Sequence, residues 1–202
     1  MRGPVPMRDD LQLISDWIPH NATLLDLGCG DGTLLAHLKA HKQTAGYGLE
    51  INQDNLAACF EKGVNVLEQD LDGGLGNFQD HRFDYVVMTQ ALQAVLRPDQ
   101  ILNEMVRVGR EAIITFPNFG HWKVRAYLGL KGRMPVSSAL PYEWYNTPNI
   151  HLCTVQDFET HCRKHGIRIL ERQVINRNHR TSVLSKWWPN LFGEIAIYRV
   201  KG

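Results

Sequence analysis

The chain has 202 residues, of which 44% are hydrophobic and 21% are charged, and its formal net charge at pH 7 is +1. This length and composition predict a globular protein with one core, and the small net charge excludes a global attraction to nucleic acid or to an anionic membrane. No apolar stretch approaches the roughly 20 residues of a membrane span, and because MRGPVPMRDD holds no apolar run we expect no secretory signal. We expect residues 1–6 to be a disordered extension and residues 7–202 to form a single domain.

The first two thirds of the chain alternate between helical spacing and short apolar runs. The pattern first predicts a helix that buries Leu11, Ile14 and Ile18, a strand over 24–28 and a helix that buries Leu34, Leu35 and Leu38. It then predicts a strand over 44–51, a helix over 52–63 and strands over 64–71 and 83–92. A helix over 99–108 and a strand over 111–116 follow. Strands that are apolar on both faces are typical of a parallel sheet covered by helices. The alternation therefore predicts right-handed βαβ units in a doubly wound α/β fold.

The pattern breaks at residues 117–153, which hold four prolines and many aromatic residues without a clear period. Beyond this insertion, we predict a helix over 154–166 and closing strands over 167–175 and 194–200, with a second irregular insertion at 177–193 between the two strands.

The four cysteines, Cys29, Cys59, Cys153 and Cys162, are scattered along the chain and form no C-x-x-C pair. This spacing argues against a zinc site, and we expect no metal. Reduced thiols are the ordinary state in a chain of cytosolic type, so we expect no disulfide.

Residues 24–38, LLDLGCGDGTLLAHL, join the first predicted strand to a helix through Gly28, Gly30 and Gly32. Glycine at every second position permits a tight turn and a close approach of the backbone to a ligand. The spacing is not the G-x-G-x-x-G of dinucleotide folds, because Thr33 stands where the third glycine would be, and no Gly-Lys-Ser/Thr of a Walker loop follows.

Acidic residues stand at the ends of the next two predicted strands. Glu50 ends the second strand, where a carboxylate can accept hydrogen bonds from both ribose hydroxyls. Asp70 ends the third strand, where it can accept from an adenine amine while Leu71 covers the ring. Singly, each acid is more often a surface or capping residue. Together and in this order they predict a nucleoside-containing cofactor.

These marks resemble the class I S-adenosylmethionine-dependent methyltransferases over roughly residues 20–116 and the closing elements. The resemblance implies a Rossmann-like, mostly parallel seven-stranded sheet with an antiparallel last strand, and S-adenosylmethionine or S-adenosylhomocysteine as cofactor. The glycines would face the methionine moiety, and Asp26 would support their loop. The cofactor-binding residues that we predict are Asp26, Gly28, Gly30, Gly32, Glu50, Ile51, Asp70, Leu71, Thr89 and Gln90.

The chain shows no recognisable methyl-acceptor motif: it lacks the Asn-Pro-Pro-aromatic motif of amine methylases and the catalytic cysteine motif of cytosine methylases. Because methyl transfer depends mostly on positioning, a missing general base does not exclude activity. His121 and His151 are the candidates for a general base. For each of them, the residues favour a hydrogen-bonded structural role over a role as a base by about two to one. Whether the chain is an enzyme therefore stays open.

Both insertions are rich in aromatic and basic residues. The first carries Trp122, Lys123, Arg125, Tyr127, Lys131, Arg133, Tyr142, Trp144 and Tyr145, and the second carries Lys186, Trp187, Trp188 and Phe192. They are consistent with a lid, a small satellite core, a protein docking surface or an RNA-binding surface. Two such insertions favour a protein partner slightly over a lid, and the small net charge ranks RNA last.

Several longer segments narrow the resemblance to the methionine biosynthesis protein MetW family. They are MRDDLQLISDWIP, TQALQAVLRPDQIL, VGREAIITFPNFGHWKVR, LPYEWYNTPNIHLCTVQDFE and SKWWPNLFGEIAIYRV, and they span nearly the whole chain from Met7. The resemblance implies a cytoplasmic bacterial protein that supports a homoserine O-acyltransferase of MetX type, with no nucleic-acid or membrane partner. It leaves two hypotheses: a partner protein that also senses S-adenosylmethionine, and an active methyltransferase with an unknown small-molecule or protein acceptor.

Overall fold

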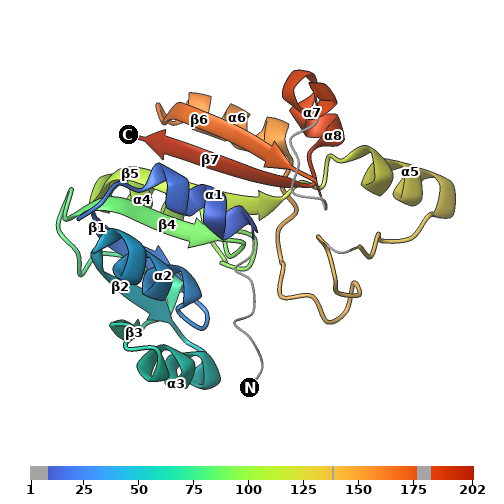
Figure 1. Cartoon of the computed structure of the whole chain (residues 1–202). Helices are drawn as coiled ribbons and strands as arrows, with labels where there is room; N and C mark the ends of the chain where they lie inside the picture. The colour runs from blue at the N-terminus through green and yellow to red at the C-terminus, as the bar shows by residue number, and fades with distance from the viewer. Residues whose placement is uncertain (1–8, 138, 177–182) are drawn as a thin grey trace.

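The structure is a computed structural model that describes residues 9–137, 139–176 and 183–202. The predicted extension at 1–6 and the start of the second insertion lie outside the described residues. Within these ranges the strands are β1 (Thr23–Leu27), β2 (Ala45–Glu50), β3 (Val66–Glu68), β4 (Phe83–Thr89), β5 (Gly109–Pro117), β6 (Arg168–Ile175) and β7 (Ile195–Lys201). They form one sheet in the order β3-β2-β1-β4-β5-β7-β6 (Figure 1).

The strand directions confirm the predicted fold class. β1 pairs in parallel with β2 and β4, and the pairs β2–β3 and β4–β5 are also parallel. β7 lies antiparallel between β5 and β6. The strand order reverses at β1, because β2 lies on one side of it and β4 on the other. In a doubly wound sheet this switch point is where ligands bind, beyond the carboxyl ends of the strands.

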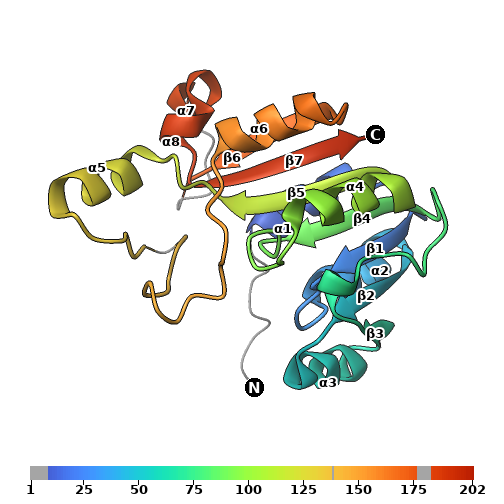
Figure 2. The ribbon, with the colours of Figure 1, turned by 180° about the vertical axis from the view of Figure 1, so that it is seen from behind.

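Helices cover both faces of the sheet. They are α1 (Asp9–Trp17), α2 (Thr33–Lys42), α3 (Gln53–Glu61), α4 (Pro98–Val108), α5 (Trp122–Lys131), α6 (Val155–Lys164), α7 (Val183–Trp187) and α8 (Pro189–Phe192), with a 3-10 turn η1 (Leu71–Gly73). Side chains of α1 and α2 pack on one face of the sheet, and those of α4 and α6 pack on the other (Figure 2). None of the helices in the described part of the chain has the length and apolarity to cross a membrane.

Two strands are shorter than predicted. β3 covers only Val66–Glu68, because it is an edge strand that pairs with β2 alone and leaves Leu67 exposed. β4 ends at Thr89, because the next residue, Gln90, takes a left-handed backbone conformation with φ 54°. Both differences lie at the carboxyl edge of the sheet.

The first insertion contains a helix that the sequence pattern does not predict. α5 leaves the end of the sheet beyond β5 (Figure 1), and Val124 is its buried side chain. A helix that buries so little of one face shows no amphipathic period, which explains the missing signal.

The side chain of Asn118 ties both insertions to the core. Its Oδ1 accepts hydrogen bonds from the main-chain N–H groups of Gly120 (2.9 Å) and Val155 (3.2 Å). Its Nδ2 donates to the carbonyl oxygens of Asn190 (3.0 Å) and Gly193 (2.8 Å). The residue is buried, so these bonds join the approach to α5, the start of α6 and the end of α8 in a dry environment.

We predict that Asn118→Ala lowers the free energy of unfolding by about 3 kcal/mol, because it leaves buried main-chain groups without partners. Chemical denaturation followed by tryptophan fluorescence measures the change. Asn146→Ala is the matched control, since Asn146 is exposed and its Oδ1 accepts one hydrogen bond, from the N–H of Glu143. A loss no larger than that of the control would contradict the role of Asn118.

Candidate functional site

The glycine loop joins β1 to α2 at the switch point of the sheet. Gly28, Gly30 and Gly32 all have positive φ angles, of 67°, 56° and 72°, which L side chains rarely adopt. A Cβ on Gly32 would lie 2.9 Å from the Sγ of Cys59, and one on Gly28 would lie 3.2 Å from the Cβ of Ala91. A Cβ on Gly30 would meet no heavy atom within 4 Å. Gly28 and Gly32 are thus required for packing, whereas the space beside the Cα of Gly30 is open.

The carboxylate of Glu50 holds this loop against the end of β2. Its Oε2 accepts a hydrogen bond from the N–H of Gly30 (2.9 Å), and its Oε1 accepts from the N–H groups of Ile51 (2.8 Å) and Asn52 (2.9 Å). The amide of Asn55 donates to Oε2 over a longer distance, 3.3 Å. A carboxylate has about four acceptor positions, so a further hydroxyl binds here most easily by displacing Asn55.

Asp70 and Leu71, which the sequence predicts on the adenine side of a cofactor, lie next to Glu50 at the carboxyl edge. The N–H of Gln69 donates to the carbonyl oxygen of Glu50 (3.1 Å), which places Asp70 beside the end of β2. Asp70 is exposed, and its Oδ1 caps η1 by accepting from the N–H of Asp72 (3.0 Å). Leu71 is half-buried against the core, and Ile51 is 58% exposed. An acceptor and two apolar side chains therefore flank the same edge.

The end of β4 forms the next part of this edge. Thr89 is half-buried and pairs with Thr115 of β5. The side chain of Gln90 donates through Nε2 to the buried carboxylate of Asp10 in α1 (3.1 Å). A left-handed backbone at a residue other than glycine is stored strain, and such residues gather at functional sites. The contact also ties α1 to the switch point.

The predicted cofactor-binding residues therefore gather at one edge, with Asp26 buried in β1 beneath the glycine loop. Sequence reasoning missed Asn55 and Asp10, whose side chains reach the site from α3 and α1. Asn55 carries no signal of its own, because its partner is known only once α3 is placed. Asp10 is an acid in a predicted amphipathic helix, where a solvent-facing position is the ordinary expectation.

The two candidate histidines lie in different cavities. His121 is the N-cap residue of α5, is 5% exposed and lines a cavity of about 350 Å³ with Lys123 and Glu194. Burial lowers the pKa of its imidazole below the ordinary value. His151 is exposed, has its Nε2 3.2 Å from the carbonyl oxygen of Leu96, and lines a cavity of about 240 Å³ between α4 and α6. The structure thus does not bring the two histidines together.

Two thiols lie beneath the glycine loop. The Sγ atoms of Cys29 and Cys59 are 3.9 Å apart, and the thiol of Cys59 donates to the carbonyl oxygen of Gly30 (3.2 Å). Burial, together with the nearby Asp26 carboxylate, raises the pKa of Cys29 far above its ordinary value, and burial also raises the pKa of Cys59. Because the thiolate is the nucleophile, neither thiol is suited to nucleophilic catalysis.

We predict that iodoacetamide at pH 8 alkylates Cys29 and Cys59 at least about 100-fold more slowly in the folded chain than in guanidinium, since both burial and a raised pKa suppress the thiolate. Peptide mass spectrometry of timed samples measures each site separately. Equal rates in the folded and the unfolded chain would show that the loop exposes reactive thiolates.

The family model described as "Methionine biosynthesis protein MetW" matches residues 8–200. The chain belongs to the MetW family. A relative from Rhodopirellula baltica, named bifunctional methionine biosynthesis protein MetXA/MetW, is 40% identical over 162 residues, which are 76% of this chain and 26% of that protein. The chain thus spans about a quarter of the length of this MetW-containing relative.

Solved structures support the fold of this MetW-family chain. An S-adenosylmethionine-dependent methyltransferase from Mesorhizobium loti has a TM-score of 0.70 at 16% identity, covering 96% of this chain and 98% of that one. A possible histamine N-methyltransferase from Thermotoga maritima has a TM-score of 0.65 at 17% identity, covering 96% and 87%. The fold is therefore that of S-adenosylmethionine-dependent methyltransferases, and a shared fold does not by itself identify a reaction.

Proposed function

We propose that this MetW-family chain binds S-adenosylmethionine at the glycine loop and acts as a partner protein of a homoserine O-acyltransferase of MetX type. The observation that carries the partnership is the Rhodopirellula baltica relative, whose name joins MetXA and MetW in one polypeptide. A fusion holds its parts together at a fixed ratio. Separate chains that work together need a docking surface instead.

The residues at the carboxyl edge fit the cofactor. The open space beside Gly30 receives the methionine moiety, and Glu50 receives the ribose hydroxyls as Asn55 withdraws. Asp70 accepts from the adenine amine, between the apolar side chains of Ile51 and Leu71. Asp26 supports the loop from below, and Thr89 with Gln90 borders the cofactor at the end of β4. When bound, S-adenosylmethionine supplies an electrophilic methyl group.

The surroundings of the site favour binding over methyl transfer. The two candidate bases, His121 and His151, line other cavities, and the thiols beneath the loop are protonated. The described residues at the edge offer carboxylates and amides that hold a ligand. Methyl transfer to an acceptor stays the alternative, and its signature is the formation of S-adenosylhomocysteine.

The insertions supply a docking surface. We define the aromatic face as their exposed aromatic side chains, which are Trp122, Tyr127, Tyr142, Trp144, Tyr145, Trp187 and Trp188. Both insertions leave the same end of the sheet (Figure 1), and Asn118 joins them through the carbonyl oxygen of Asn190. Protein interfaces are enriched in tryptophan and tyrosine, and exposed apolar patches of this kind mark interaction sites.

Co-purification with the MetX-type acyltransferase of the same organism tests the proposal. We expect a stable complex and faster acyl transfer to homoserine than the acyltransferase achieves alone. Full activity of the isolated acyltransferase together with the absence of a complex would refute the partnership. Calorimetry with S-adenosylmethionine tests the cofactor independently, and equal affinities with and without the acyltransferase would mean that the cofactor does not regulate the partner, because linkage is reciprocal.

A further inference from the structure

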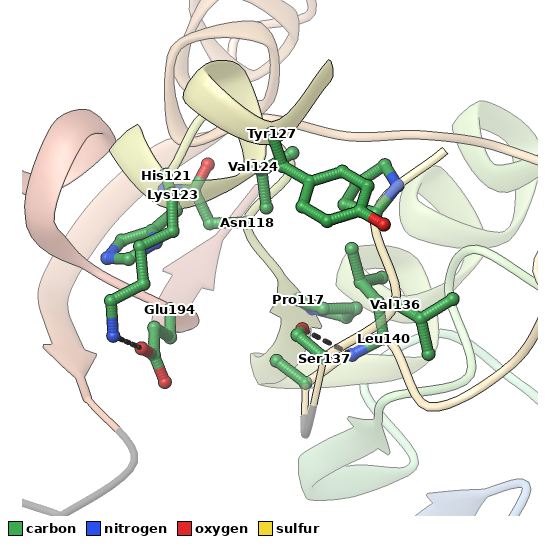
Figure 3. A pocket seen from close by; sticks show the side chains of 12 residues that line it. Pro117, Asn118, His121, Lys123, Val124, Tyr127, Val136, Ser137, Leu140 and Glu194 are labelled. Carbon is green, nitrogen blue, oxygen red and sulfur yellow. Dashed lines mark hydrogen bonds and ion pairs between the residues drawn. The ribbon is translucent and has the colours of Figure 1, made fainter. Parts of the chain in front are cut away.

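The cavity that His121 lines lies away from the glycine loop, between α5 and residues 135–137 and 139–140. Pro117, the last residue of β5, lies at the base of the cavity (Figure 3). The cavity has a volume of about 350 Å³. Small-molecule sites begin at about this size. The cavity is therefore large enough for a metabolite of modest size.

The two ends of the cavity differ in polarity. Lys123, His121 and Glu194 lie at one end, and Tyr127, Val136 and Leu140 lie at the other (Figure 3). A ligand that fills this space needs a polar head and an apolar tail.

The polar end carries one group of each charge. The Nζ of Lys123 is 3.7 Å from the Oε1 of Glu194, beyond hydrogen-bond distance. The side chain of Glu194 is 16% exposed and that of Lys123 is 65% exposed, so the carboxylate lies deeper than the ammonium group. Such a separated pair can admit a ligand that carries both charges, and a zwitterion brings no net charge into the cavity.

His121 adds a polar side chain to the lining of this cavity. The residue as a whole is 5% exposed, and its ring contacts the ring of Trp122, with 6.0 Å between the ring centroids. The ring nitrogens are not among the fully buried polar atoms that lack a partner, so they are open to water or to a ligand that enters the cavity. A neutral imidazole offers one donor and one acceptor to it.

We propose that this pocket binds an α-amino acid with an apolar side chain. Glu194 receives the ammonium group, Lys123 receives the carboxylate, and the ring of His121 bonds to the polar head. The side chain lies along Tyr127, Val136 and Leu140. A ligand with only an ammonium group would contact Glu194 and not Lys123, and a ligand with only a carboxylate would contact Lys123 and not Glu194. The proposal depends neither on the cofactor nor on the acyltransferase.

Calorimetric titration of the full chain with L-methionine tests the proposal, because this amino acid has an unbranched apolar side chain. Two analogues lack one charge each: 3-(methylthio)propylamine lacks the carboxylate, and 4-(methylthio)butanoate lacks the ammonium group. We expect saturable binding of L-methionine and at least tenfold weaker binding of both analogues. No saturation up to about 10 mM, or equal binding of an analogue, would overturn the proposal.

Variants locate the binding. Glu194→Gln and Lys123→Met should each weaken L-methionine binding at least tenfold. Lys131→Met removes the same charge from the exposed end of α5, outside the pocket lining, and should leave the affinity within twofold. Affinity that survives in Glu194→Gln would place the amino acid elsewhere, including in the glycine loop, and would overturn the proposal.

A spectroscopic readout keeps the proposal testable if a variant fails to fold. In the unaltered chain, L-methionine should shift the Cε1–H resonance of His121, which is assigned by its absence in His121→Gln. The resonance of His151, in the other cavity, should stay in place. A saturable titration that moves His151 and leaves His121 unchanged would contradict the assignment.

Discussion

Glu50→Gln should weaken S-adenosylmethionine binding at least about 100-fold and lower the free energy of unfolding by about 1–3 kcal/mol. The carboxylate accepts hydrogen bonds from three main-chain N–H groups, of Gly30, Ile51 and Asn52. A glutamine keeps one acceptor oxygen and turns an NH₂ group toward the remaining donors. The loop that presents Gly30 therefore loses its anchor, and the ribose loses its acceptor, in the same substitution.

Glu68→Gln is the matched control, because Glu68 ends the neighbouring strand β3 and its exposed carboxylate accepts from the side chain of Gln53 (2.8 Å). It should leave the affinity within twofold and the stability within about 0.5 kcal/mol. Calorimetry measures binding, and urea denaturation measures stability. Unchanged affinity in Glu50→Gln would show that the ribose is held by another group.

Asn55→Ala separates the two roles of Glu50. The amide of Asn55 makes the longest contact with the Glu50 carboxylate, 3.3 Å, and occupies the position that we propose for a ribose hydroxyl. We expect this variant to bind S-adenosylmethionine as well as the unaltered chain or up to about fivefold more tightly, because a competing donor is gone. A loss of affinity would mean that Asn55 itself contacts the cofactor.

The gathering of the candidate site residues at the carboxyl ends of the strands was predictable, because parallel strands all end on the same side of the sheet. Glycines and acids placed at the ends of successive predicted strands must therefore meet, whatever the exact lengths of the strands. Their partners were not predictable. Three of the hydrogen bonds that Glu50 accepts come from main-chain N–H groups, which every residue but proline carries, so the sequence letters give no sign of them.

The insertions show the same limit more strongly. Periodicity predicts a helix only where one face is buried, and α5 buries Val124 while Trp122 and Tyr127 stay exposed. Asn118 is a single residue in FPNFGHW, and its four partners are main-chain groups of three separate segments. The sequence showed that these segments are unusual, and their joint attachment to the end of the sheet emerges only from the structure.

Replacing one tryptophan in each insertion should weaken the complex with the acyltransferase by about 2–4 kcal/mol per substitution, which is about 30- to 1000-fold in Kd. The variants are Trp144→Ala and Trp187→Ala, whose side chains are 74% and 77% exposed. An exposed tryptophan contributes little to folding and a large contact area to an interface, so the free energy of unfolding should stay within about 0.5 kcal/mol. Biolayer interferometry with the immobilised acyltransferase measures the affinity.

Phe60→Ala is the control for the general loss of an exposed aromatic side chain. Phe60 is 68% exposed on α3. Figure 1 shows α3 beside the edge strand β3, whereas α7 lies near β6, the edge strand on the other side of the sheet. It should change the affinity less than twofold. Weakening by Trp144→Ala and Trp187→Ala together would mean that the acyltransferase covers both insertions, as their link through Asn118 leads us to expect. If neither substitution weakens the complex, or if Phe60→Ala weakens it as much, then the aromatic face is not the docking surface.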